Sequence, residues 1–368
     1  MPSDTLRIVH CVGARPNFVK LAPVYRALAA YPCVDQLAIH TGQHYTAAMS
    51  GQMILDVGMP EQMLNLGVES SDLAALMTAL KPRLAEETPS DKRRALVIVY
   101  GDVNSTLAAA LAAMELGIPV AHVESGLRSY DRSMPEEWSR YLTDHIATLL
   151  FAPDEGARYN LVREGIPAEQ VYKVGNVMID SLVRALPTLP PVDRAPITYA
   201  LVTLHRPSNV DDLSWLAGFM AELVAVGRDM IPIVFPAHPR TRKALFDGPT
   251  AINIDTHIEN VKIIYPLPYL EFLALEKRAT LVITDSGGVQ EETTYLGVPC
   301  LTIRENTERP ITITQGTNTL VGRDTAKLRV AVEVALAKER GEPPVLELWD
   351  GHAAERIAKI IVEEYPTL

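Results

Sequence analysis

The chain has 368 residues, of which 48% are hydrophobic and 21% are charged, a composition typical of soluble globular proteins. Its formal net charge of −11 argues against nucleic acid or an anionic membrane as a partner, and no apolar run is long enough to span a bilayer. Because the length is large for one hydrophobic core, two domains of roughly 170–190 residues are expected.

Short apolar runs alternate with amphipathic segments in the first half of the chain. This alternation predicts parallel βαβ units with right-handed crossovers. The expected strands are 7–12, 37–41, 95–100, 119–123, 149–152 and 171–174, and the expected helices are 18–30, 73–84, 104–116 and 137–147.

A proline-rich stretch after Asp180 interrupts the alternation and marks a domain boundary. The pattern then restarts, with expected strands at 199–203, 231–235, 261–265, 281–284 and 299–303, and expected helices at 212–226, 240–246, 269–278, 288–296 and 324–339. We therefore expect an α/β protein with two Rossmann-like, doubly wound parallel-sheet domains that face a cleft. They would span residues 1–185 and 186–350, and a helix within 351–368 would pack back on the first domain.

The segment 281–310 indicates where an anionic ligand would bind. A β-branched run ends at Thr284, and Ser286, Gly287 and Gly288 then turn directly into a helix. This layout places backbone N–H groups and a helix N-terminus at the carboxyl end of a strand, where a phosphate is favoured. Glu291 and Glu292 lie one turn further along, and their carboxylates favour a ribose diol. The segment is typical of a nucleotide-diphosphate site, although neither half carries the G-x-G-x-x-G pattern of a dinucleotide cofactor.

The first strand leads into Gly13-Ala14-Arg15-Pro16, with Lys20 one turn later. Pro16 suits the first position of a helix, and Gly13 allows a sharp turn. Arg15 and Lys20 would flank this helix start and could hold a diphosphate. The alternative is a glycine turn with solvated basic residues.

Three carboxylates follow strands in the first half. Asp102 and Glu124 come directly after apolar runs, and Glu136 stands at an expected helix start behind Pro135. The carboxyl ends of parallel strands open on the ligand crevice, so these residues are candidates for acid–base catalysis. The alternatives are a turn residue for Asp102 and a first-turn helix acid for Glu136.

Two histidines end strands in the second half, His205 before Arg206 and His238 before Pro239. A buried core histidine is the alternative reading of His205. Neither histidine has Cys or Glu at metal-ligand spacing, and the cysteines Cys11, Cys33 and Cys300 are widely separated. We therefore expect no metal site and a reducing, cytoplasmic location.

The ordered set of these motifs resembles the non-hydrolysing UDP-N-acetylglucosamine 2-epimerases, which have the two-Rossmann glycosyltransferase-B (GT-B) architecture. The resemblance covers nearly the whole chain. It rests on Gly13 to Pro16, Thr41 to His44, Gly101-Asp102, Val123 to Arg128, Pro135 to Glu137, His205-Arg206, Thr284 to Glu292 and Thr307 to Pro310. One departure is Asn17, which stands where the family often has Glu.

The resemblance implies roles for individual residues. UDP would lie on the second domain, with uracil near Phe272, ribose on Glu292, and the diphosphate on Ser286, Gly287, Gly288, His205 and Arg15. Catalysis would rest on Asp102, Glu124, Glu136 and His205, with the cations Lys20, Arg140 and Arg309 lining the cleft. A second UDP-sugar site of the family lies near Gln43, His44 and His238.

The implied reaction is reversible C2 epimerisation through elimination and re-addition of UDP, without a cofactor. The expected partners are a UDP-sugar and a second copy of the chain in a homodimer. The alternatives are a related UDP-2-acetamido sugar as substrate, a GT-B glycosyltransferase, a hydrolysing epimerase and a non-catalytic nucleotide-sugar sensor.

Overall fold

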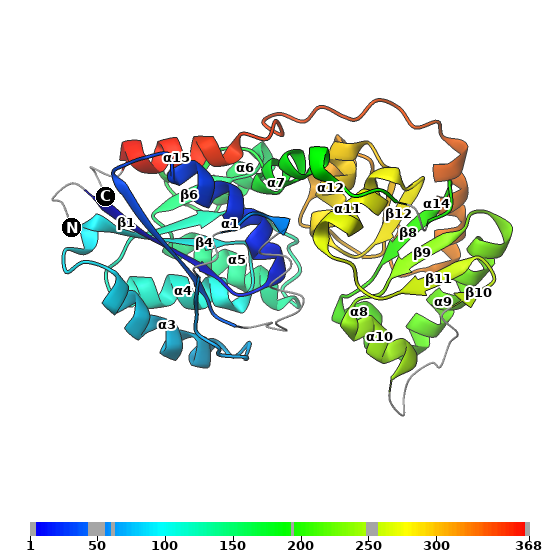
Figure 1. Cartoon of the computed structure of the whole chain (residues 1–368), viewed down its shortest axis with the longest axis horizontal. Helices are drawn as coiled ribbons and strands as arrows, with labels where there is room; N and C mark the ends of the chain where they lie inside the picture. The colour runs from blue at the N-terminus through cyan, green and yellow to red at the C-terminus, as the bar shows by residue number, and fades with distance from the viewer. Residues whose placement is uncertain (1–4, 43–55, 60–62, 193–194, 248–256, 365–368) are drawn as a thin grey trace. The chain divides into compact units, whose positions relative to one another are not determined.

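The computed structural model describes all residues except 1–4, 43–55, 60–62, 193–194, 248–256 and 365–368. The chain divides into two compact units (Figure 1). Unit 1 comprises Met1–Ala185 and Glu347–Leu368, and unit 2 comprises Leu186–Leu346.

Unit 1 is built on a parallel sheet with the strand order β3-β2-β1-β4-β5-β6-β7. The central strand β4 is buried along its whole length, as expected for an apolar run covered on both faces. The strands are β1 (Leu6–Val12), β2 (Val34–His40), β3 (Leu64–Asn65), β4 (Ala95–Tyr100), β5 (Val120–Val123), β6 (Leu149–Ala152) and β7 (Val171–Lys173).

The helices of unit 1 pack in two groups. Helices α1, α7 and α15 contact one another, and α3 and α5 both contact α4. Asp180 ties the C-terminal helix to this unit, because its carboxylate accepts hydrogen bonds from the amides of Ala353 (3.1 Å) and Ala354 (2.7 Å). The helices are α1 (Arg15–Leu28), α3 (Leu73–Glu87), α4 (Asn104–Glu115), α5 (Pro135–Ile146), α6 (Glu155–Arg163), α7 (Val177–Ala185) and α15 (Ala353–Glu364).

Unit 2 repeats this architecture with the strand order β10-β11-β9-β8-β12-β13-β14, in which only β10 pairs antiparallel among the described strands. Its core lies where α9 and α14 pack on the sheet. The strands are β8 (Ala200–Thr203), β9 (Ile233–Pro236), β10 (His257–Ile258), β11 (Val261–Ile264), β12 (Leu281–Thr284), β13 (Cys300–Thr302) and β14 (Asn318–Leu320). The helices are α8 (Pro207–Val210), α9 (Leu213–Asp229), α10 (Pro239–Phe246), α11 (Tyr269–Arg278), α12 (Gly287–Leu296), α13 (Pro310–Thr314) and α14 (Thr325–Ala337).

The predicted fold class, two Rossmann-like parallel-sheet domains, is confirmed. The sequence prediction missed the short strands β3, β10 and β14, which have two or three residues each and therefore show no periodicity. It also missed the helices α6, α7, α8 and α13. Within the described part of the chain, no helix combines the length and apolar character needed to cross a membrane.

Candidate functional site

The carboxyl ends of β4 and β5 carry the first two predicted carboxylates. Asp102 follows β4 and Glu124 follows β5, and these strands are hydrogen-bonded neighbours in the sheet of unit 1. Gly101 between β4 and Asp102 has φ +64, and a Cβ there would lie 2.8 Å from Nζ of Lys20. The positive φ of this turn therefore favours glycine.

Glu124 has an uncommon backbone conformation. Its φ of +71 lies in the left-handed region, which side chains other than glycine rarely adopt. Its buried carboxylate forms an ion pair with the ammonium of Lys20, which is also buried. Strained residues of this kind concentrate at functional sites, which supports a functional role for this carboxylate.

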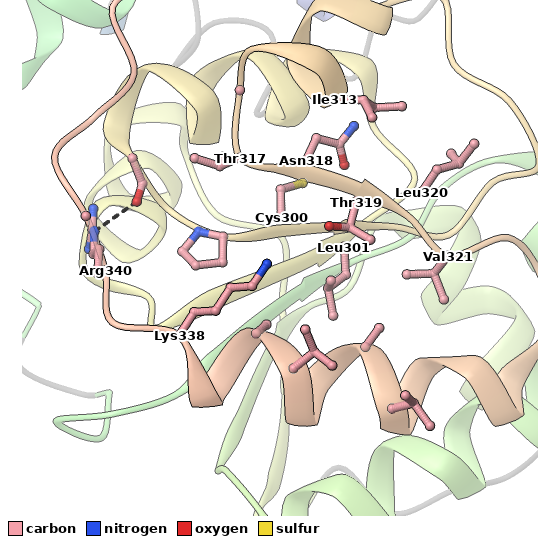
Figure 2. A pocket seen from close by; sticks show the side chains of 18 of the residues that line it. Cys300, Leu301, Ile313, Thr317, Asn318, Thr319, Leu320, Val321, Lys338 and Arg340 are labelled. Carbon is pink, nitrogen blue, oxygen red and sulfur yellow. Dashed lines mark hydrogen bonds between the residues drawn. The ribbon is translucent and has the colours of Figure 1, made fainter.

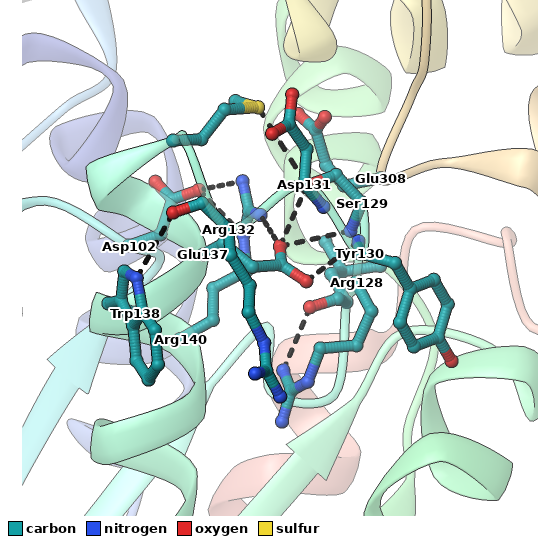
Figure 3. Close-up of polar contacts among 12 residues, drawn as sticks. Asp102, Arg128, Ser129, Tyr130, Asp131, Arg132, Glu137, Trp138, Arg140 and Glu308 are labelled. Atoms are coloured by element: carbon teal, nitrogen blue, oxygen red, sulfur yellow. Dashed lines mark hydrogen bonds and ion pairs between the residues drawn. The ribbon is translucent and has the colours of Figure 1, made fainter.

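Asp102 lies against the buried guanidinium of Arg140 on α5 (Figure 3). Nε and Nη2 of Arg140 donate to Oδ2 of Asp102 at 2.9 and 2.6 Å, and Nη1 donates to Oε2 of Glu137 at 2.6 Å. Arg140 is therefore a bridge between two carboxylates, rather than a cation standing apart from them.

Glu137 fixes the segment before α5. Its carboxylate accepts hydrogen bonds from the amides of Ser129 (3.0 Å) and Tyr130 (2.8 Å) and from the Ser129 hydroxyl (2.9 Å). The predicted residue Glu136 is its half-buried neighbour in the first turn of α5. Sequence reasoning singled out Glu136 alone, because two adjacent acids at a helix start do not show which one turns inward.

The start of α1 is joined to the end of β4 by Asn17. Its side-chain amide donates to the Tyr100 carbonyl (2.6 Å) and accepts from the Ala14 amide (3.2 Å). Because a glutamate could not donate to that carbonyl, this contact is specific to the residue that departs from the family pattern. Arg15 is the first residue of α1, and its side chain lies outside the described part of the structure, as do Gln43 and His44 entirely.

A buried polar network lies behind these carboxylates and was not predicted from the sequence. His122 on β5 places Nδ1 2.6 Å from Oδ1 of Asp144 and Nε2 2.8 Å from the Gly101 carbonyl oxygen. Arg128 pairs with the other oxygen of Asp144 at 2.7 Å. Burial alone would raise the pKa of Asp144, but His122 and Arg128 lower it overall. The network fixes the turn that carries Asp102.

In unit 2, three predicted residues follow three adjacent strands. His238, His205 and Ser286 come after β9, β8 and β12, which are neighbours in the sheet. The His205 and His238 rings lie 5.8 Å apart between centroids. His238 also caps α10, with Nδ1 accepting from the Arg240 amide at 3.3 Å. Parallel strand order thus brings the predicted histidines and the glycine turn to one edge.

Asp285 holds His205 in place and was not singled out from the sequence. Its fully buried carboxylate lies 2.8 Å from Nδ1 of His205 and accepts hydrogen bonds from the amides of His205 (3.1 Å) and Arg206 (2.9 Å). Burial alone would raise the pKa of Asp285, but the His205 ring and these two amides lower it overall. The sequence could have identified Asp285, since this residue directly follows a strand and precedes the glycine turn.

The N-terminus of α12 has the geometry of an anion-binding site. Gly287 and Gly288 open this helix, and the first N–H groups of a helix have no intrahelical acceptor. A Cβ on Gly287 would meet the ends of the Arg309 and Glu308 side chains, so a larger residue there would displace this buried ion pair. Arg309 in turn places Nε 2.9 Å from Oε1 of Glu291, and it also pairs with Glu308.

The predicted ribose-binding residue, Glu292, is buried on α12 and accepts a hydrogen bond from the Tyr269 hydroxyl at 2.9 Å. Phe272, the predicted uracil contact, is half-buried on α11. Glu276, also on α11, is fully buried near Glu292 and was not predicted from the sequence. Burial raises the pKa of Glu292 to about 7.

A cavity of about 760 Å³ lies elsewhere in unit 2, along β13, β14 and α14 (Figure 2). Its lining includes Cys300, Lys338 and Arg340, and none of the predicted site residues. Among the residues that the structure describes, no group of three or more His, Cys, Asp and Glu side chains is arranged to hold a metal ion.

Comparison with known proteins gives one family. Residues 26–362 match the family model described as UDP-N-acetylglucosamine 2-epimerase. The chain is 40% identical to the UDP-N-acetylglucosamine 2-epimerase of Methanocaldococcus jannaschii, over 95% of this chain and 97% of that protein. It is 36% identical to a UDP-2,3-diacetamido-2,3-dideoxy-D-glucuronate 2-epimerase of Pseudomonas aeruginosa, over 97% of this chain and 100% of that protein.

A solved structure of the M. jannaschii UDP-GlcNAc 2-epimerase, in complex with UDP-GlcNAc and UDP, superposes with a TM-score of 0.88 at 40% identity. The alignment covers 98% of this chain and 99% of that one. The GT-B architecture expected from the sequence is thereby confirmed. The chain belongs to the UDP-N-acetylglucosamine 2-epimerase family, whose curated members are isomerases.

Proposed function

We propose that this protein interconverts UDP-N-acetylglucosamine and UDP-N-acetylmannosamine by inverting C2 of the sugar. Within the family, the observation that carries the proposal is the pair of carboxylates on adjacent strand ends of unit 1. Asp102 and Glu124 are each held by a buried cation, Arg140 and Lys20 respectively. A site that only binds a nucleotide has no use for two such carboxylates.

In this proposal, UDP binds to unit 2. The diphosphate lies at the N-terminus of α12, where Gly287 and Gly288 let the backbone approach closely. His205, held by Asp285, is at an adjacent strand end and contacts the same anion. The ribose hydroxyls donate to Glu292, and the uracil packs near Phe272, with Arg309 as a further cation.

The chemistry requires that UDP leaves first. The C2 proton is not adjacent to a carbonyl, so direct deprotonation is prohibitively slow. Breaking the anomeric C–O bond creates an oxocarbenium-like centre, and the departing UDP anion is stabilised by the helix N-terminus and His205. A carboxylate then removes the C2 proton and leaves a 2-acetamidoglucal beside UDP.

Protonation of the opposite face of C2, by a group that exchanges its proton with solvent, and re-addition of UDP give the manno epimer. Three carboxylates, Asp102, Glu124 and Glu136, divide the acid and base roles of this cycle. The route uses neither a metal ion nor a nicotinamide. Lys20 and Arg140 keep Glu124 and Asp102 in fixed positions while protons and charge move.

Incubation with UDP-N-acetylglucosamine in heavy water tests the proposal. Proton NMR is expected to show deuterium at C2 and formation of the manno epimer. Glu124→Gln should reduce this exchange by about 10²–10⁴-fold, because it removes a proton-transfer group, while UDP binding is retained. Glu155→Gln, at an exposed position on α6, is the matched control and should not change the rate.

Two outcomes would contradict the proposal at different levels. Absence of both C2 deuteration and the manno product would reject this substrate, and near-normal exchange in Glu124→Gln would remove Glu124 from the catalytic set. The P. aeruginosa relative is named for a 2,3-diacetamido glucuronate substrate, so the same assay with that UDP-sugar distinguishes the alternative. Release of free N-acetylmannosamine and UDP would indicate a hydrolysing enzyme instead.

We further propose a homodimer formed through the outer face of α5. The usual distribution of polar and apolar residues is reversed in this helix. Its buried face is polar (Glu137, Ser139, Arg140, Thr143 and Asp144), and its exposed face carries aromatic and aliphatic residues. Trp138, Tyr141 and Leu142 are 46%, 39% and 42% exposed. An apolar helix face turned to solvent marks an interaction surface, and a second copy of the chain would cover it.

Light scattering after size-exclusion chromatography tests the interface. The unmodified chain should elute with twice its 40.4 kDa mass, and Leu142→Glu should convert it to a monomer, because a buried charge is costly. Val334→Glu in unit 2, where the valine is 51% exposed, is the control and should remain dimeric. A dimer that survives Leu142→Glu would place the interface elsewhere.

A further inference from the structure

Two carboxyl groups are buried against each other in unit 2, on the packed helices α11 and α12. Glu276 has no solvent exposure and Glu292 has 4%. The two carboxyl groups interact electrostatically. The Tyr269 hydroxyl donates to Oε1 of Glu292 at 2.9 Å, whereas both carboxyl oxygens of Glu276 are buried without a hydrogen-bond donor among the described residues. Among the described residues, no Lys or Arg forms an ion pair with either carboxyl group.

Two neighbouring carboxylates without a counterion cannot both be charged, so the pair must share a proton. The groups that face the pair are Tyr269 from α11 and Cys300 from β13, and both are neutral near pH 7 because burial raises their pKa values. Burial and the neighbouring charge of Glu292 raise the pKa of Glu276 well above its usual range. Glu276 therefore keeps the shared proton and donates it in a hydrogen bond to Glu292.

We infer that Glu276 is a positioning residue for nucleotide recognition: its O–H holds the Glu292 carboxylate in the orientation that accepts the ribose hydroxyls. An ionised carboxylate offers about four acceptor positions. Tyr269 and Glu276 occupy one each, which leaves positions for the 2′ and 3′ hydroxyls of a ribose. This inference rests on the proposed function, in which Glu292 binds the ribose of UDP.

The arrangement links nucleotide binding to proton release. When both carboxyl groups are protonated, Glu292 carries a hydrogen where a ribose hydroxyl must donate, so one proton has to leave before the diol binds fully. Affinity for the diol should therefore increase as the pH rises, by up to tenfold per pH unit for one linked proton. A purely structural acid pair would show no such dependence, and its replacement by an apolar side chain would leave affinity unchanged.

The test compares UDP with 2′,3′-dideoxy-UDP by calorimetry on the full-length protein between pH 6 and pH 8. The two probes have the same ionisable phosphates, so the ratio of their affinities isolates the ribose hydroxyls. In the unmodified protein this ratio should rise with pH in favour of UDP. Glu276→Leu removes the donor and should lower the preference for UDP at least tenfold at pH 7, as expected for a hydrogen bond to a charged group.

Glu276→Gln is the matched control, because its amide N–H still donates to Glu292, and it should keep the preference for UDP within about threefold of the unmodified protein. A Glu276→Leu variant that folds and prefers UDP as strongly as the unmodified protein would overturn the inference. A preference that does not change with pH in the unmodified protein would also overturn it, even if Glu276→Leu fails to fold. If UDP does not bind at all, the proposed function itself is rejected instead.

Discussion

Replacing Arg140 by methionine should abolish C2 exchange and lower the free energy of unfolding by about 3–5 kcal/mol, the range for breaking a buried ion pair. The guanidinium is 2% exposed and bridges Asp102 and Glu137 through three hydrogen bonds (Figure 3). Removing it takes this buried cation from both carboxylates. Urea denaturation and deuterium incorporation measure the two effects.

The substitution should also disturb the structure around the ion pair, because the Glu137 carboxylate accepts hydrogen bonds from the backbone amides of Ser129 and Tyr130. Arg140→Lys should recover only part of the stability, since an ammonium cannot reproduce the fork that reaches two carboxylates. Arg158→Met is the control, because its pair with Glu155 is exposed and should contribute at most about 1 kcal/mol. Normal exchange in a folded Arg140→Met variant would contradict the assigned role of this bridge.

The sheets were predictable from the sequence because their central strands are buried on both faces. A continuous apolar run such as β4, flanked by helical segments, can hardly form anything other than a buried strand. The short edge strands could not be predicted, since β3 has two residues and its pairing with β2 is decided by the sheet already formed. Sequence periodicity also predicts that a helix buries its apolar face, but α5 buries its polar face and exposes its apolar one.

Strand ends were the useful guide to the candidate site. Asp102, Glu124, His205 and Ser286 each follow a strand of a parallel sheet, and that rule alone places each pair on one edge of its unit. The partners of these residues could not be predicted, because they come from distant parts of the chain. Arg140 reaches Asp102 across 38 positions, and Asp285 reaches His205 across 80.

Replacing Asp285 by asparagine should weaken UDP binding by at least tenfold and lower the free energy of unfolding by about 2–4 kcal/mol. The carboxylate lies fully buried after β12, against Nδ1 of His205, and it accepts hydrogen bonds from the His205 and Arg206 amides and from the Asn209 side chain. Asparagine has one acceptor oxygen, and its amide group would face donors. His205 would lose its fixed orientation near the diphosphate.

The pH dependence of this stability difference follows from the lowered pKa of Asp285. A carboxyl group whose folded-state pKa is lowered stabilises the protein above its unfolded pKa of about 4, and this contribution is lost as the pH falls through the folded-state value. The difference between Asp285→Asn and the unmodified protein should therefore shrink as the pH falls below about 4.

Asp324→Asn is the control for this substitution, because Asp324 caps α14 at an exposed position and asparagine caps a helix equally well. Its free energy of unfolding should stay within about 0.5 kcal/mol of the unmodified protein at each pH. If Asp285→Asn unfolds like this control and binds UDP normally, then the carboxylate does not organise the end of β8. The diphosphate would then depend on the N-terminus of α12 alone, without an oriented His205.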